Sequence, residues 1–92
     1  MEENYRLFWE DDYQKILQLI AKKRIEKKLT QWDVSKRLGL SESGYFKIEK
    51  GTSRLDMIRF LTIINILETS PIDFFQELEK TTPLKKIRQT YF

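Results

Sequence analysis

Apolar residues recur along the chain every three or four positions, which is the spacing typical of amphipathic α-helices. After an acidic cluster at residues 10–12, the apolar positions fall mostly on one helical face: Ile16, Leu17, Leu19, Ile20 and Ala21. Acidic side chains suit a helix N-terminus, because they meet free backbone N–H groups and the positive end of the helix dipole. We therefore expect a first helix over about residues 12–28.

The next segment predicts two short helices joined by a tight turn. Thr30 is a suitable N-cap for a helix over about Gln31–Leu38, and Ser41 for a helix over about Glu42–Lys50. Gly39 can adopt the left-handed conformation that a β-carbon disfavours, so it ends the first of these helices. A small residue and several apolar residues are expected to form their shared seam: Ser35, Val34, Leu38, Leu40, Tyr45 and Ile48.

Two further amphipathic segments follow Gly51. Asp56 can cap a fourth helix, whose apolar stripe we expect to lie in the core: Met57, Phe60, Leu61, Ile64 and Leu67. Ser70 and Pro71 fit the cap and first turn of a short fifth helix that contains Phe74, Phe75 and Leu78. No stretch alternates with period two for long enough to form a strand. The sequence therefore predicts an all-α, compact five-helix bundle.

These helices form one predicted domain, residues 12–80, with a short extension at each end. Residues 1–11 contain several aromatic residues, which we expect to fill the core or an interface. Trp32 is expected either to pack on residues 5–9 or to contact the DNA backbone or a partner. Residues 81–92 fit either a short extra helix in contact with a partner subunit or a basic arm. Phe74 and Phe75 together exceed what so small a core needs, so one of them is a candidate for a dimer interface.

Composition narrows the classes of function. The chain has no Cys and no His, which excludes disulfides and thiolate zinc sites and removes the usual general base. The carboxylates at residues 11–12 and 77–79 lack a neighbouring nucleophile or Gly-rich loop, and we expect them to be solvated. No apolar run approaches the roughly 20 residues that span a bilayer, and the acidic start does not resemble a signal peptide. We expect a cytoplasmic protein that is not an enzyme and needs no metal, cofactor or membrane.

The net charge of +3 conceals four unlike segments. Residues 1–14 carry −4, residues 15–59 carry +7, residues 60–79 carry −4 and residues 80–92 carry +4. A basic block between acidic segments is what a polyanion-binding face would produce. Lysines scattered over solvated helices would give the same totals, so charge alone does not decide.

Three short sequence motifs at fixed spacing favour a polyanion-binding protein. They are Leu29-Thr30-Gln31, Leu38-Gly39-Leu40-Ser41 and Ile48-Glu49-Lys50-Gly51. Together they resemble the Cro/cI or XRE-type helix-turn-helix family of phage repressors, and the resemblance covers about residues 16–75. It implies a lambda-repressor-like fold and binding of double-stranded DNA, with the helix over residues 42–50 in the major groove.

The resemblance also implies roles for particular residues. Four residues on the outward side of the recognition helix would read bases: Glu42, Ser43, Phe46 and Lys47. Five would contact phosphate: Thr30, Gln31, Ser41, Lys50 and Arg54. Arg24 and Glu49 match a buried structural pair that joins the first helix to the third.

The expected function is therefore a sequence-specific transcriptional regulator, bacterial or phage-encoded, that binds a palindromic operator as a homodimer. Phage or plasmid repressor, restriction–modification controller and antitoxin are the settings that the resemblance implies. The alternative is a protein-interaction module that keeps the fold but has a weakened DNA face. Glu42, Phe46 and Trp32 favour this alternative, because they place an acid and aromatic rings where phosphate binders carry amides and bases.

Overall fold

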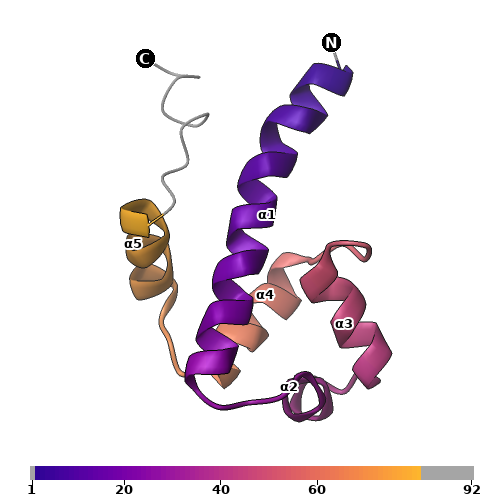
Figure 1. Ribbon diagram of the computed structural model, residues 1–92, viewed down its shortest axis with the longest axis vertical. Coiled ribbons are helices and arrows are strands. Elements are labelled where there is room, and N and C mark those ends of the chain that lie inside the picture. Colours follow the sequence, from indigo (N-terminus) through magenta and orange to yellow (C-terminus); the bar gives the residue numbers. More distant parts are fainter. Residues whose placement is uncertain (1, 82–92) are drawn as a thin grey trace.

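The computed structural model describes residues 2–81, with side chains from residue 10 onward. Within this range the chain forms five helices and no strand: α1 (Glu2–Glu26), α2 (Gln31–Leu38), α3 (Glu42–Lys50), α4 (Met57–Ile66) and α5 (Pro71–Thr81). In Figure 1, α1 stands between α5 on one side and α2 and α3 on the other. The predicted all-α, five-helix bundle is confirmed.

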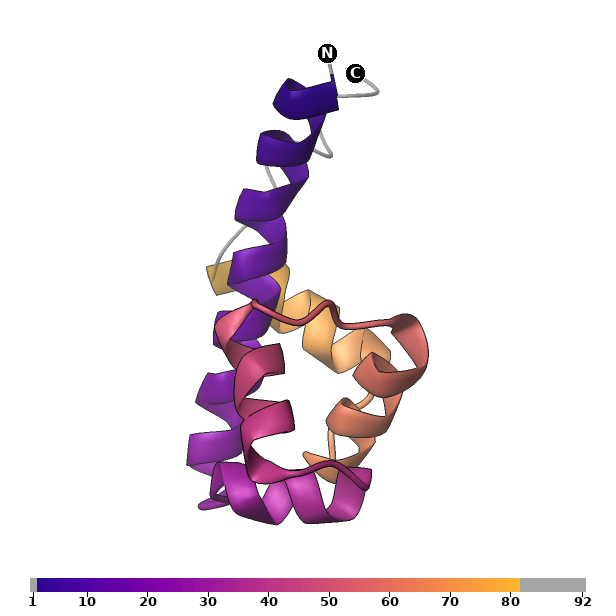
Figure 2. The same ribbon diagram turned by 90° about the vertical axis from the view of Figure 1, so that its right-hand side faces the viewer.

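The first helix begins ten residues earlier than its predicted start, so the expected cap at residues 10–12 is wrong. Residues 2–11 contain no Gly, Pro or β-branched residue, so nothing in this stretch of sequence disfavours a helix. The added turns project beyond the rest of the bundle (Figures 1 and 2). Asp12 consequently lies inside the helix and is buried, not solvated as expected, with Lys15 Nζ 4.0 Å from its Oδ1.

Local capping fixes the ends of α2 and α3, which begin and end where the sequence predicts. Thr30 and Asp33 form a capping box: the Asp33 N–H donates to Thr30 Oγ1 at 3.0 Å, and the Thr30 N–H donates to Asp33 Oδ2 at 2.8 Å. The second of these bonds lowers the pKa of Asp33. Gly39 has a φ of 79°, the left-handed conformation expected of it, and the Ser41 hydroxyl accepts from the Gly44 N–H at 3.0 Å.

The core lies where α1, α2 and α3 meet α4 and α5. Its buried apolar residues are Leu17, Leu19, Ile20, Val34, Tyr45, Ile48, Phe60, Ile63, Ile64, Leu67, Phe74 and Leu78. Of the predicted seam, Val34, Ser35, Tyr45 and Ile48 are fully buried, and Leu38 and Leu40 pack against them in part. The tight seam holds α2 and α3 together as one unit. Lys23 Nζ joins α1 to α5 through a 2.7 Å bond to Glu77 Oε1, which lowers the pKa of Glu77.

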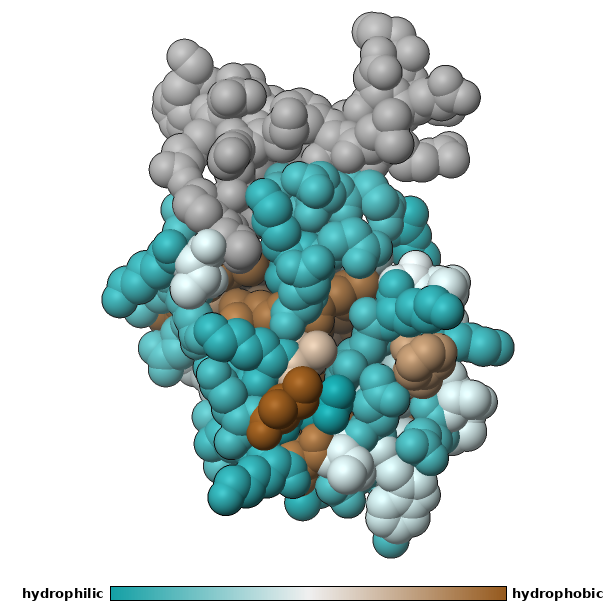
Figure 3. Space-filling model, viewed as in Figure 1, coloured by the Kyte–Doolittle hydropathy of each residue, from teal (hydrophilic) through white to brown (hydrophobic). Residues whose placement is uncertain are grey.

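The apolar stripe of α4 is only partly buried. Phe60, Ile63, Ile64 and Leu67 form the inner face, but Met57 and Leu61 are exposed, so their predicted place in the core is wrong. At about 100° per residue they lie to one side of the inner face, where no neighbouring helix covers them. The face of the molecule seen in Figure 3 is mostly hydrophilic, and hydrophobic residues appear on it as smaller areas between hydrophilic ones.

Candidate nucleic-acid interface

The outward side of α3 carries the four residues predicted to read bases. Glu42, Ser43, Phe46 and Lys47 are all exposed, whereas Tyr45 and Ile48 on the opposite side are buried. Figure 2 shows that α3 has no helix in front of it in that view, so its outward side is open to a ligand. The period of the helix therefore separates residues that hold α3 in the bundle from residues that are available for binding.

Two exposed aromatic rings on α2 and α3 are each covered by a lysine. Lys36 Nζ lies 4.6 Å from the centre of the Trp32 ring, and Lys50 Nζ lies 5.5 Å from the centre of the Phe46 ring. Trp32 is half exposed, and α2 lies at the carboxyl end of α1, while residues 5–9 lie near its amino end (Figure 1). The expected packing of Trp32 on residues 5–9 involves side chains outside the described ones, so it stays a prediction.

The predicted phosphate contacts have different surroundings. Thr30 and Ser41 are exposed caps at the amino ends of α2 and α3, where backbone N–H groups favour anions. Lys50 is exposed beside Phe46. Gln31 is only partly exposed, and its side-chain amide donates to Glu49 Oε1 at 3.1 Å. Arg54 follows α3 in the loop before α4, and its Nη2 lies 3.3 Å from Glu10 Oε1.

A polar cluster anchors α3 to α1 and α2. Arg24 donates from Nε to Glu49 Oε2 at 2.7 Å and from Nη2 to Oε1 at 3.3 Å, and its Nη1 donates to the Leu29 carbonyl at 2.8 Å. The Arg24 and Glu49 side chains are only 12% and 7% exposed. Burial, followed by the neighbouring Glu49 carboxylate, raises the pKa of the Tyr45 hydroxyl well above its ordinary value. The cluster is therefore structural, and Glu49 is not free for base or phosphate chemistry.

Sequence reasoning paired Arg24 with Glu49 but missed Gln31 and Tyr45 as members of the same cluster. A signal existed for Tyr45, because it stands four residues before Glu49 and shares its side of the helix. It also missed Glu10 and Tyr13, which contact the loop after α3. More than forty residues separate those partners, and no local pattern joins them.

Comparison with models of known protein families identifies the family of this chain. A family model described as helix-turn-helix matches residues 20–74, from within α1 to within α5, which is more than half of the chain. The chain belongs to the XRE-type helix-turn-helix family. It is accordingly a DNA-binding regulator of the XRE type, and a domain of this kind is not typically enzymatic. The chain matches none of the curated proteins or solved structures with which it was compared.

Two other kinds of site can be checked over the part of the chain that the structure describes. Among the side chains of residues 10–81, no three acidic, His or Cys groups come together in a way that could hold a metal ion. Over the same residues, no helix has both the length and the apolar character needed to cross a membrane. The outward side of α3 and the caps beside it remain the best candidate for a binding site.

Proposed function

We propose that the protein is a sequence-specific transcriptional regulator that places α3 in the major groove of duplex DNA. The observation that carries this proposal is the exposed side of α3, where Glu42, Phe46 and Lys47 stand clear of the core. Lys47 can donate to guanine N7 or O6, Glu42 can accept from cytosine N4, and Phe46 can contact a thymine methyl group. Ser43 can either donate or accept.

Phosphate contacts would fix the position of α3 in the groove. The amino ends of α2 and α3 offer the hydroxyls of Thr30 and Ser41 together with backbone N–H groups. Lys50 and Arg54 add positive charge near the carboxyl end of α3. Gln31 would have to release Glu49 to reach a phosphate with its side chain, so we assign it a contact through its backbone N–H only.

The test of this proposal is the Lys47→Ala variant. We expect it to weaken binding to the preferred site by about 1–3 kcal/mol and to relax selection at one base position. Preferred duplexes would be selected from a random pool with both proteins, and affinities would then be titrated at one salt concentration. Lys22→Ala removes the same charge from an exposed side chain of α1 that lies 4.0 Å from Glu77 of α5, and it should leave the preferred sequence unchanged. Identical base preferences for Lys47→Ala and wild type would contradict the assigned reading face.

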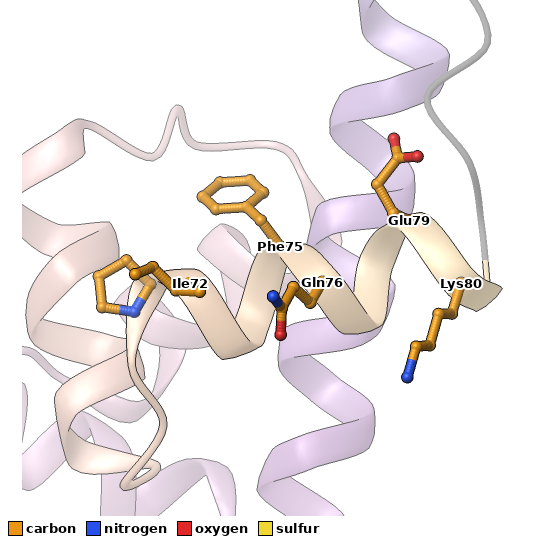
Figure 4. A pocket seen from close by; sticks show the side chains of 6 residues that line it. Ile72, Phe75, Gln76, Glu79 and Lys80 are labelled. Carbon is orange, nitrogen blue, oxygen red and sulfur yellow. The ribbon is translucent and has the colours of Figure 1, made fainter.

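We further propose that two copies bind a palindromic operator, because one helix reads only a few base pairs. The support comes from five exposed apolar residues, which we call the α4/α5 apolar surface: Met57 (66% exposed), Ile58 (79%), Leu61 (44%), Ile72 (70%) and Phe75 (39%). Ile72 and Phe75 line a shallow hollow together with Gln76, Glu79 and Lys80 (Figure 4). Glu79 and Lys80 border these apolar residues, and opposite charges on one surface can pair across a two-fold contact between identical copies.

Replacing Ile72 with Glu tests this dimer. Ile72 is largely exposed, so the fold should survive, while a charge in the α4/α5 apolar surface should prevent association. We expect a monomer by light scattering and a loss of about 10²-fold in affinity for a palindromic site. Ile25→Glu is the matched control, since Ile25 is 63% exposed at the end of α1 and lies outside this surface. A monomeric wild type at concentrations that saturate the operator would overturn the proposed dimer.

One observation favours a second candidate, a protein-interaction module with a weak DNA face. Trp32 and Phe46 are both about half exposed on the two helices that would meet DNA. A salt series on random duplex separates the two functions. A DNA-binding dimer should lose affinity with a log–log slope of roughly −4 or steeper. Absence of duplex binding at low salt would favour the protein-interaction module.

A further inference from the structure

The loop between α3 and α4, residues 51–56, is attached to α1 at three points. Gly51 has a φ of 92°, and a β-carbon there would lie only 2.8 Å from Gln14 Nε2, so glycine permits a close approach. The Leu55 N–H donates to the Tyr13 hydroxyl at 2.9 Å. The guanidinium of Arg54 lies 5.4 Å from the centre of the Tyr13 ring, and its Nη2 lies 3.3 Å from Glu10 Oε1. We call this set the loop–α1 contact.

The loop–α1 contact brings the acidic first segment of the chain against the basic block. Glu10 belongs to the segment that carries −4, and Arg54 belongs to the segment that carries +7. A carboxylate offers the guanidinium the same kind of acceptor oxygens that a phosphate offers. The Arg54 side chain is 72% exposed, so the ion pair is open to exchange with an outside anion. The Tyr13 ring meanwhile limits where the guanidinium can lie.

We propose that Glu10 holds Arg54 in the free protein and competes with a DNA phosphate for it. The proposal rests on the proposed function, because it requires Arg54 to face DNA. A phosphate that is well placed by base contacts displaces Glu10, so DNA binding loses the free energy of the ion pair each time a phosphate takes its place. Glu10 thereby lowers affinity for every duplex whose phosphate reaches Arg54, although it does not touch DNA.

The test is the Glu10→Gln variant, compared with Asp11→Asn. Both substitutions remove one negative charge from neighbouring positions, but Asp11 is paired with Lys15 at 3.7 Å and not with Arg54. Affinity for random duplex at low salt should rise about 1.5- to 5-fold more in Glu10→Gln than in Asp11→Asn, the range set by an exposed ion pair. The log–log salt slope of Glu10→Gln should become more negative by up to about one. Affinity for the selected site should rise at least as much as affinity for random duplex, because a well-placed phosphate breaks the ion pair completely.

An Arg54→Ala background completes the experiment, because Glu10→Gln should have no more effect there than Asp11→Asn. Equal affinity gains from Glu10→Gln and Asp11→Asn in the natural background would overturn the proposal and leave DNA binding intact. A gain from Glu10→Gln that persists without Arg54 would also overturn it. If the wild-type protein fails to bind any duplex, both the proposed function and the role of Glu10 fall together, which is a different result from either of these.

Discussion

Replacing Glu49 with alanine is expected to lower the free energy of unfolding by about 3–5 kcal/mol. The substitution leaves the Arg24 guanidinium, which is only 12% exposed, without the carboxylate that it contacts at 2.7 Å and 3.3 Å. The Gln31 amide loses its acceptor as well. Small domains are stable by only about 5–15 kcal/mol, so the variant should be close to unfolding. Urea denaturation followed by circular dichroism measures the loss.

Two comparisons isolate the cause of this loss. Glu68→Ala also removes a carboxylate from a basic partner, Lys27 at 3.1 Å, but these side chains are 76% and 43% exposed, so the loss should stay below about 1 kcal/mol. Replacing Arg24 with Met and Glu49 with Leu together should cost less than Glu49→Ala alone, because no charge is then left buried without its partner. Equal losses from Glu49→Ala and Glu68→Ala would contradict the structural role of the cluster.

The single substitution Phe74→Ala is expected to lower the free energy of unfolding by about 3–5 kcal/mol. Phe74 is fully buried between α4 and α5, and its ring meets Phe60 edge-on at 5.3 Å and Phe75 at 5.5 Å. Truncation removes these contacts and leaves a cavity that the short surrounding helices can fill only in part. The same denaturation measurement applies.

Phe75→Ala is the matched control for Phe74→Ala. Phe75 is exposed to a considerable extent, so the same truncation should cost a folded monomer much less than Phe74→Ala does. Both variants should be made in the Ile72→Glu background, since loss of a dimer contact would otherwise add to the loss of core packing. A larger cost for Phe75 than for Phe74 in that background would show that their places in the core and on the surface have been exchanged.

The elements that the sequence predicts best are those whose ends are set by neighbouring residues. Thr30, Gly39 and Ser41 fix the bounds of α2 and α3 through bonds that reach no further than five residues. The start of α1 was predicted wrongly for the opposite reason. An acidic cluster can cap a helix or lie within one. Only a helix-breaking residue, Gly or Pro, just before residue 10 would have indicated that the helix begins at this cluster.

The candidate site also combines features that the sequence predicts with features that depend on contacts between distant residues. Helical periodicity correctly predicts that Phe46 and Lys47 lie on the opposite side of α3 from Ile48. Periodicity does not predict how much of an apolar stripe its neighbours cover, and Met57 and Leu61 are exposed for that reason. The contact between Glu10 and Arg54 joins residues 44 positions apart, and it exists only because the whole bundle brings the loop against α1.

The single helix α1 holds α3 in place at two points. Arg24 contacts α3 itself, and Tyr13 contacts the loop that follows α3. Their spacing is set by helical rise, about 16 Å for eleven residues, and their angular phase by helical twist. One residue inserted between them would rotate Tyr13 by about 100° about the axis and carry it away from the loop. The length of this stretch of α1 is therefore constrained as firmly as the residues on it.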